Sequence, residues 1–153
     1  MIEGKNISKK FGDKILFENF SFLIQDGDFV CFSGASGTGK TTLLNIIGLI
    51  EPPDQGELII NGIQYVTKKQ KLEYFRSQVG FLFQNFALIE NKTVRQNLEL
   101  IRADSRTDYT VIAALQKVGL ADKLNSKVYT LSGGEQQRVA LARLFLKKCE
   151  IIL

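Results

Sequence analysis

The chain has 153 residues, of which 44% are hydrophobic and 24% charged, and its net charge is +4. This balance describes one globular domain or part of one, and it excludes disordered and fibrous classes of protein. Histidine is absent and only two cysteines occur, which excludes histidine acid–base chemistry, most zinc sites and a disulfide framework.

The first 25 residues favour β structure. Ile2–Ser8 is predicted as a strand, Phe11–Lys14 as a turn, and Ile15–Ile24 as a further β-rich run. Phe29–Ser33 is a short apolar run, so we predict a buried strand there. Cys31 lies within that run and Cys149 also has apolar neighbours, and both cysteines are expected to pack in the core.

The segment Gly34–Thr41 fits the pattern G-x-x-x-x-G-K-[ST], the phosphate-binding P-loop. Its glycines allow positive φ, so that successive N–H groups can point at a phosphate. Lys40 adds a mobile positive charge for the β- and γ-phosphates, and the Thr41 hydroxyl is the expected Mg²⁺ ligand. A buried helix expected over residues 42–50 directs the positive end of its dipole at the anion. The predicted cofactor-binding residues are Gly34, Ala35, Ser36, Gly37, Thr38, Gly39, Lys40, Thr41 and Thr42.

Turn-forming residues follow this helix. Pro52–Gly56 breaks the structure, and Glu57–Ile60 is predicted as a strand that ends in a tight turn at Asn61-Gly62. Residues 67–77 are predicted as a short basic helix. The order of strand, glycine loop and helix is the context that a P-loop requires.

The second half of the chain changes to a helical pattern. Val79–Phe83 is predicted as a buried strand that ends at Gln84. Apolar residues at helical spacing run from Thr93 to about Gly119, with a helix start at Ser105–Asp108. A strong helix is expected from Ser132 to about Lys148, and residues 151–153 resemble the beginning of a strand.

The segment Leu131–Arg138, with the sequence LSGGEQQR, is the second informative motif. Ser132 can cap the helix that follows, and Gly133 and Gly134 leave N–H groups open at its N-terminus, which is a second place for an anion. By mechanism alone the segment could be only a capped helix. Together with the P-loop, however, it resembles the signature motif of ATP-binding-cassette ATPases, and this resemblance covers the whole chain.

The resemblance implies an α/β fold, a P-loop NTPase (RecA-like) core with an antiparallel β subdomain and a helical subdomain. Residues 1–85 and 132–153 match the β subdomain and core, and residues 86–131 match the helical subdomain. Phe11 occupies the place of the aromatic residue that stacks on adenine. Gln84 matches the Q-loop glutamine, which contacts Mg²⁺ or the attacking water, so Lys40 and Gln84 are the catalytic candidates. The implied contacts to a nucleotide held by a second subunit are Ser132, Gly133, Gly134 and Glu135.

The implied function is ATP binding and hydrolysis that drive transport through a membrane permease, with ATP and Mg²⁺ as cofactors. The implied partners are the permease and a second ATP-binding subunit, with no nucleic acid, at the cytoplasmic face of the membrane. Phe83–Phe86 and Glu135–Ala140 are similar to the branch that releases lipoproteins or exports macrolides and bacteriocins. The Asp-Glu pair of the Walker B strand, the D-loop and the switch histidine do not occur, so the chain resembles a C-terminally truncated cassette without its own activity. Phe29–Ser33 is then expected to lack a neighbouring strand.

Three alternatives stay open at the level of sequence. One is a soluble cassette ATPase that acts on nucleic acid or the ribosome. Another is a small-molecule P-loop kinase, in which Leu131–Glu135 would be coincidental. The third is an ATP-binding fragment without catalysis.

Overall fold

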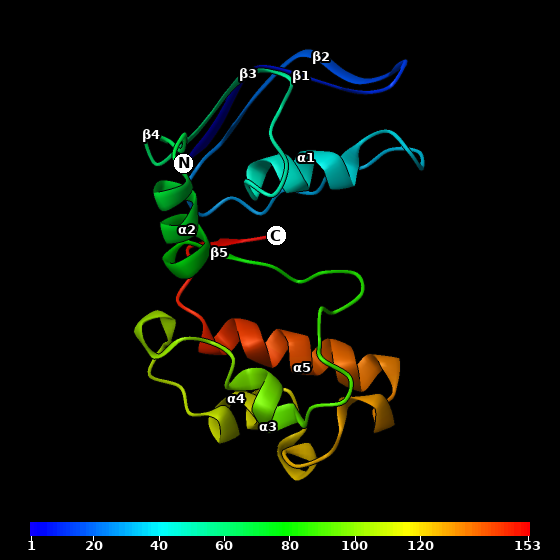
Figure 1. The fold of residues 1–153 in the computed structure, drawn as a ribbon, viewed down its shortest axis with the longest axis vertical. Coiled ribbons are helices and arrows are strands. Elements are labelled where there is room, and N and C mark those ends of the chain that lie inside the picture. Colours follow the sequence, from blue (N-terminus) through cyan, green and yellow to red (C-terminus); the bar gives the residue numbers. More distant parts are fainter. The chain divides into compact units, whose positions relative to one another are not determined.

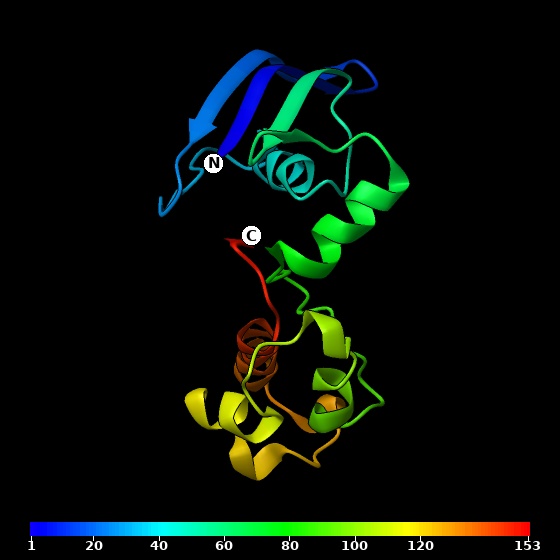
Figure 2. The same ribbon diagram turned by 90° about the vertical axis from the view of Figure 1, so that its left-hand side faces the viewer.

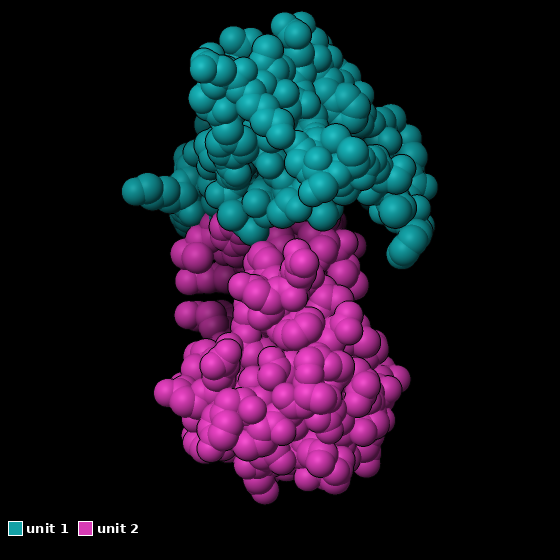
Figure 3. Space-filling model, turned by 90° about the vertical axis from the view of Figure 1, so that its right-hand side faces the viewer, with its two compact units in different colours: residues 1–71 teal, residues 72–153 magenta.

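The computed structural model describes all residues from Met1 to Leu153. The chain forms two compact units, residues 1–71 and residues 72–153 (Figure 3). The boundary between the units falls inside the helix α2, Lys68–Ser77. The presence of α2 confirms the short basic helix expected over residues 67–77. The α/β class, with an antiparallel sheet and a helical region, is confirmed. The finer subdomain boundaries inferred from sequence stay a prediction.

An antiparallel sheet with the strand order β2-β1-β3-β4 forms most of the first unit (Figure 2). The hairpin between β3 and β4 pairs Ile60 with Ile63 across Asn61 and Gly62. Both turn residues have positive φ, 51° and 75°, as a two-residue type I′ hairpin requires. The strands are β1 Ile2–Phe11, β2 Lys14–Ile24, β3 Gln55–Ile60 and β4 Ile63–Gln64.

The helix α1, Lys40–Ile47, lies close to this sheet within the first unit (Figures 1 and 2). This helix ends at Ile47, before the predicted end at residue 50, because Leu49 adopts a left-handed backbone with φ 56°. Apolar side chains from both the helix and the sheet are buried, and they form the core of this unit. They include Ile2, Ile7, Leu43, Ile46, Ile47, Leu58 and Ile60.

Phe29–Ser33 is not the buried strand that its composition predicts. The segment has no regular secondary structure, the side chain of Phe29 is 99% exposed, and Cys31 is exposed as well. A strand needs a hydrogen-bonding neighbour, and none of the six strands pairs with this segment. An apolar run without a neighbouring strand therefore stays an irregular, largely exposed connection between the sheet and the P-loop.

Three helices and three 3₁₀ turns form most of the second unit. The helices are α3 Val94–Leu98, α4 Val111–Lys117 and α5 Gly133–Leu146, and the turns are η1 Ala103–Ser105, η2 Ala121–Lys123 and η3 Val128–Thr130. No helix of the chain is both long enough and apolar enough to cross a membrane. The buried core between the helices consists of Val94, Leu98, Ala114, Leu115, Leu120, Leu131, Val139, Ala142 and Leu146.

Two short strands of the second unit pair in parallel, β5 Val79–Gly80 with β6 Ile151–Ile152. β6 confirms the strand expected at residues 151–153, whereas β5 is shorter than the predicted residues 79–83. Gly80 has no room for a side chain, because a Cβ would lie 2.7 Å from Leu144 Cδ2 and 2.9 Å from Cys149 Sγ. Burial raises the pKa of the half-buried Cys149 thiol, in agreement with a packing role.

The helix start predicted at Ser105–Asp108 is wrong. α4 begins after Thr110, whose hydroxyl accepts a hydrogen bond from the Ala113 amide at 3.1 Å. Ser105 ends the turn η1, and Arg106 forms an antiparallel β-bridge with Lys147. That long-range pairing holds residue 106 in an extended conformation and so moves the start of the helix along the chain.

Replacing Leu115 by alanine is expected to lower the free energy of unfolding by about 2–5 kcal/mol, because the fully buried side chain would leave a cavity. Ile112 lies on the same helix and is 49% exposed. Ile112→Ala should cost less than about 1 kcal/mol. Urea unfolding of the full-length protein, followed by circular dichroism, measures both losses. Equal losses would contradict the assignment of Leu115 to the core.

Candidate functional site

The P-loop takes a conformation that only glycine adopts readily. Gly37 and Gly39 have φ values of 76° and 95°, and Gly39 directly precedes α1. A Cβ at Gly39 would lie 2.7 Å from Phe17 Cζ and 3.3 Å from Leu16 Cβ, both on β2. Glycine is therefore required at position 39 for two reasons, the positive φ angle and the close approach to β2.

The Lys40 ammonium lies against the first part of the same loop. Its Nζ donates hydrogen bonds to the carbonyls of Gly34 and Ala35, at 2.9 and 2.7 Å. The Thr38 hydroxyl donates to the Ala35 carbonyl at 2.9 Å and closes the turn. A lysine ammonium has three N–H donors, so one of them is left for an anion bound by the loop. The exposed Thr41 hydroxyl is placed on the first turn of α1.

A cavity of about 430 Å³ separates the P-loop from the β1–β2 hairpin of the same unit. This volume lies in the range of small-ligand sites. The hairpin contributes Phe11, Lys14 and Leu16 to the cavity wall. The loop and α1 contribute Ser36, Gly37, Gly39, Lys40, Thr41 and Thr42. Two ammonium groups, one aromatic ring and the open loop thus surround a space suited to a phosphorylated aromatic ligand.

Lys14 and Leu16 were not predicted as site residues. The sequence places Lys14 in a turn, and the hairpin then brings it to the loop, where its Nζ would lie 3.2 Å from a Cβ at Gly37. The only signal in the sequence is a basic residue three positions after Phe11. Phe11 was predicted from the resemblance, and its half-exposed ring does line the cavity.

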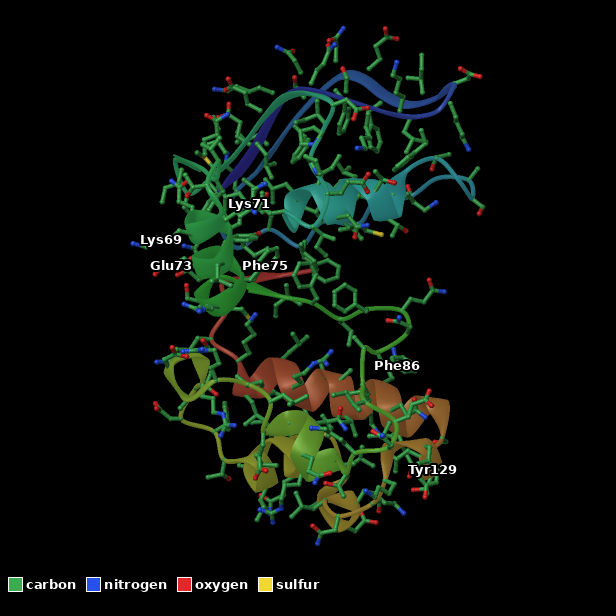
Figure 4. All side chains as sticks on the ribbon, viewed as in Figure 1. Lys69, Lys71, Glu73, Phe75, Phe86 and Tyr129 are labelled. Carbon is green, nitrogen blue, oxygen red and sulfur yellow. The ribbon has the colours of Figure 1, made fainter.

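Gln84 is exposed in the second unit and begins a turn over residues 84–87. Phe86 of this turn is labelled in Figure 4. Phe86 and Ala87 both have positive φ, 59° and 45°, which strains residues other than glycine. Arg143 on α5 donates to the Phe86 carbonyl at 2.9 Å and to the Ala87 carbonyl at 2.7 Å. Burial lowers the pKa of Arg143, although an arginine stays charged at neutral pH. Sequence reasoning missed this arginine, which fixes the turn after Gln84.

The signature segment also belongs to the second unit and begins α5. Ser132 and Glu135 form a reciprocal capping box, with the Ser132 amide bound to Glu135 Oε2 at 2.8 Å. That amide, followed by the Ser132 hydroxyl, holds the pKa of Glu135 below its usual range. Gly133 and Gly134 are exposed, and no atom lies within 4 Å of a Cβ built at Gly133. The open N-terminus of α5 is therefore accessible to another molecule.

The family model for ABC transporters matches residues 17–153, which is most of the chain and includes both motifs. The chain belongs to the ABC transporter family. Its resemblance to ATP-binding-cassette ATPases, carried by the P-loop and the signature, is thereby confirmed.

Two curated relatives of this ABC chain are equally similar to it. The L-cystine transport system ATP-binding protein TcyN of Escherichia coli is 38% identical over 99% of the chain, which spans 66% of that relative. The macrolide export ATP-binding/permease protein MacB of Campylobacter jejuni is 38% identical over the whole chain, which spans 25% of it. Because a cystine transport protein matches as well as a macrolide exporter, these comparisons do not select the branch predicted from sequence.

A solved structure supports the cassette fold. The ATP-binding cassette MJ0796, in a dimeric post-hydrolysis state bound to ADP and Pi, superposes with a TM-score of 0.83 at 34% identity. The match covers 99% of this ABC chain and 72% of the solved chain.

Gly39→Ala is expected to lower the free energy of unfolding by at least about 2 kcal/mol, because the new methyl combines left-handed strain with a collision against Phe17. Gly12→Ala is the matched control, since Gly12 also has positive φ, 55°, but no atom within 4 Å of its Cβ position. The control should cost about 1 kcal/mol from strain alone. Denaturant unfolding of the full-length variants distinguishes the two, and equal losses would mean that β2 does not constrain the P-loop.

Proposed function

We propose that this chain is the nucleotide-binding part of an ABC transporter ATPase that couples binding and hydrolysis of MgATP to transport. One observation carries the proposal: the P-loop and the half-exposed Phe11 ring line one cavity together with Lys14 and Lys40. The cavity offers cations and loop amides to the phosphates and a ring to the adenine. The relative MJ0796 was solved with ADP and Pi, which supports a nucleotide as the ligand.

Each predicted site residue has a proposed role. Loop amides from Gly34 to Gly39 and the Lys40 ammonium would bind the phosphates. Thr41 is proposed as a ligand of Mg²⁺, and Gln84 is proposed to contact Mg²⁺ or the attacking water. The exposed Thr41 hydroxyl and the amide oxygen of Gln84 are oxygen donors of the kind that Mg²⁺ takes alongside phosphate oxygens. The metal would neutralise charge that develops on the γ-phosphate.

The signature is proposed to act on a second copy of the nucleotide site. Ser132, Gly133, Gly134 and Glu135 form the accessible N-terminus of α5. In a two-fold dimer, each such N-terminus would contact the γ-phosphate held by the partner's P-loop. No Asp-Glu pair occurs in the 153 residues, so we assign hydrolysis to the full-length dimer and only nucleotide binding to the residues described.

The proposed partner outside the dimer is a membrane permease at the cytoplasmic face of the membrane. In this proposal Gln84 senses that partner, and the Arg143 hydrogen bonds to the turn that Gln84 begins support it by holding the turn in place. We also propose the lipoprotein-release or macrolide- and bacteriocin-export branch, on the similarity of Phe83–Phe86 and Glu135–Ala140. Names of relatives such as MacB are compatible with this branch.

Lys40→Ala is expected to weaken ATP binding by about 10- to 150-fold, because it removes a charged donor from the phosphate loop. The matched control is Lys69→Ala, which removes the same charge from the exposed surface of α2 (Figure 4) and should leave the affinity unchanged. Isothermal titration of ATP into the full-length protein measures both affinities. An unchanged affinity for Lys40→Ala would refute the P-loop assignment.

Ser132→Arg should leave ATP binding by the monomer intact yet prevent ATP-driven dimerisation and turnover, because the large side chain would fill the space above α5. Asn125→Arg adds the same charge to the exposed loop between η2 and η3 and should allow dimerisation. Light scattering with and without ATP, together with phosphate release, tests both variants. Loss of ATP binding by the Ser132→Arg monomer would show that the signature acts on its own P-loop instead.

A further inference from the structure

Lys9 on β1 is a buried lysine with a complete set of partners. The residue is only 7% exposed, and its Nζ lies 3.0 Å from Glu51 Oε1. The same nitrogen donates to the Pro52 carbonyl at 2.9 Å and lies 3.2 Å from Asp54 Oδ1. Three acceptors match the three N–H donors of an ammonium group, so its position is fixed. The hydrogen bond that the Lys9 ammonium donates to the Glu51 carboxylate raises the pKa of Lys9, which keeps this group charged.

The partners of Lys9 belong to the segment that directly follows the P-loop helix. Asp54 also accepts a hydrogen bond from the Lys10 amide at 2.8 Å, and its own amide donates to the Ser8 carbonyl at 2.9 Å. The end of the α1 segment is thereby attached to β1 immediately before the hairpin. The two walls of the nucleotide cavity, P-loop helix and hairpin, are connected at this point.

The Lys9 ammonium lies over the ring of Phe11, 5.2 Å from the ring centroid. This distance is within the range of a cation–π interaction. The Phe11 ring is half exposed and lines the cavity, so part of its surface is available to a ligand while the ammonium contacts it.

A buried lysine adds little to the free energy of folding, because the cost of desolvating its charge offsets most of the attraction in its ion pairs. A methionine or leucine could fill the same space at a lower cost. The charge has a different use here: a cation over one face of an aromatic ring fixes that ring and draws electron density from the opposite face. An electron-rich purine stacks well on such a face.

We propose that Lys9 is a positioning residue of the nucleotide site, which holds the Phe11 ring in place for stacking on the base and ties that ring to the segment after the P-loop helix. The proposal rests on the proposed function, in which the P-loop cavity binds ATP. It adds a residue, and a physical reason for base binding, that neither motif contains.

The test compares ATP with inorganic triphosphate, which has the phosphates but no base. Lys9→Met in the full-length protein removes the charge and keeps much of the side-chain volume. It should weaken ATP binding by about 2- to 30-fold and leave triphosphate binding unchanged. Phe11→Ala should show the same selective loss, and adding Lys9→Met to it should change nothing further. Lys9→Arg, which keeps a cation, should retain most of the ATP affinity.

Lys10→Met is the matched control, because Lys10 is the neighbouring lysine, is exposed, and has no contact with the ring. It should leave the affinities for ATP and triphosphate unchanged. An equal loss of ATP and triphosphate binding in Lys9→Met would overturn the proposal, because Lys9 would then act on the phosphate site or on the fold. If Lys9→Met does not fold, Glu51→Gln removes one anchor of the ammonium and must show the same selective loss of ATP.

Different experimental outcomes would refute the proposed function and the proposed role of Lys9. If the wild-type protein binds neither ATP nor triphosphate, the proposed function is wrong. If the wild-type protein binds both and Lys9→Met binds both equally well, only the role of Lys9 is wrong. These 153 residues contain no tryptophan, so Phe11→Trp supplies an indole at the ring position that can be excited selectively over the four tyrosines. Quenching of its emission by ATP and not by triphosphate would support base stacking there, and equal emission with both would refute it.

Discussion

The close approach of Gly39 to Leu16 and Phe17 is the contact on which the site depends. A side chain at residue 39 would push the P-loop away from β2, and the cavity between loop and hairpin would lose its shape. With glycine in this place, the start of α1 lies against the same hairpin that carries Phe11 and Lys14. The P-loop residues and the Phe11 ring therefore come from two separate pieces of the chain but line one cavity.

Buried cations that bind to backbone carbonyls recur in both units. Lys9 binds the Pro52 carbonyl, Arg143 binds those of Phe86 and Ala87, and Lys147 donates to Phe75 and Val79, both at 2.5 Å. Desolvation lowers the pKa of Lys147, so its hydrogen bonds must offset the cost of burying the charge. Lys9 and Arg143 fix segments outside regular secondary structure, whereas Lys147 connects the end of α2 to the start of β5.

The helix α5 contacts most parts of the second unit. Its first residue is capped by Ser132, its apolar side packs against α3 and α4, and Arg143 near its other end holds the turn after Gln84. Tyr129, in the turn η3 just before this helix, is well exposed (Figure 4). One helix thus connects the signature to the turn that begins at Gln84.

The sequence by itself determined whatever depends on neighbours within a few residues. The P-loop pattern, the Asn61-Gly62 hairpin turn and the start of α5 at Ser132 follow from local backbone preferences and capping, and all are present as predicted. The tertiary structure alone decided features that require a distant partner. Phe29–Ser33 has the composition of a strand but no strand to pair with, and Arg106 is held extended by Lys147. Lys14 lines the P-loop cavity only because the β1–β2 hairpin brings it to the loop. Local pattern fixes φ and ψ preferences, whereas pairing, burial and close contact are set by residues that the fold brings together from far apart in the chain.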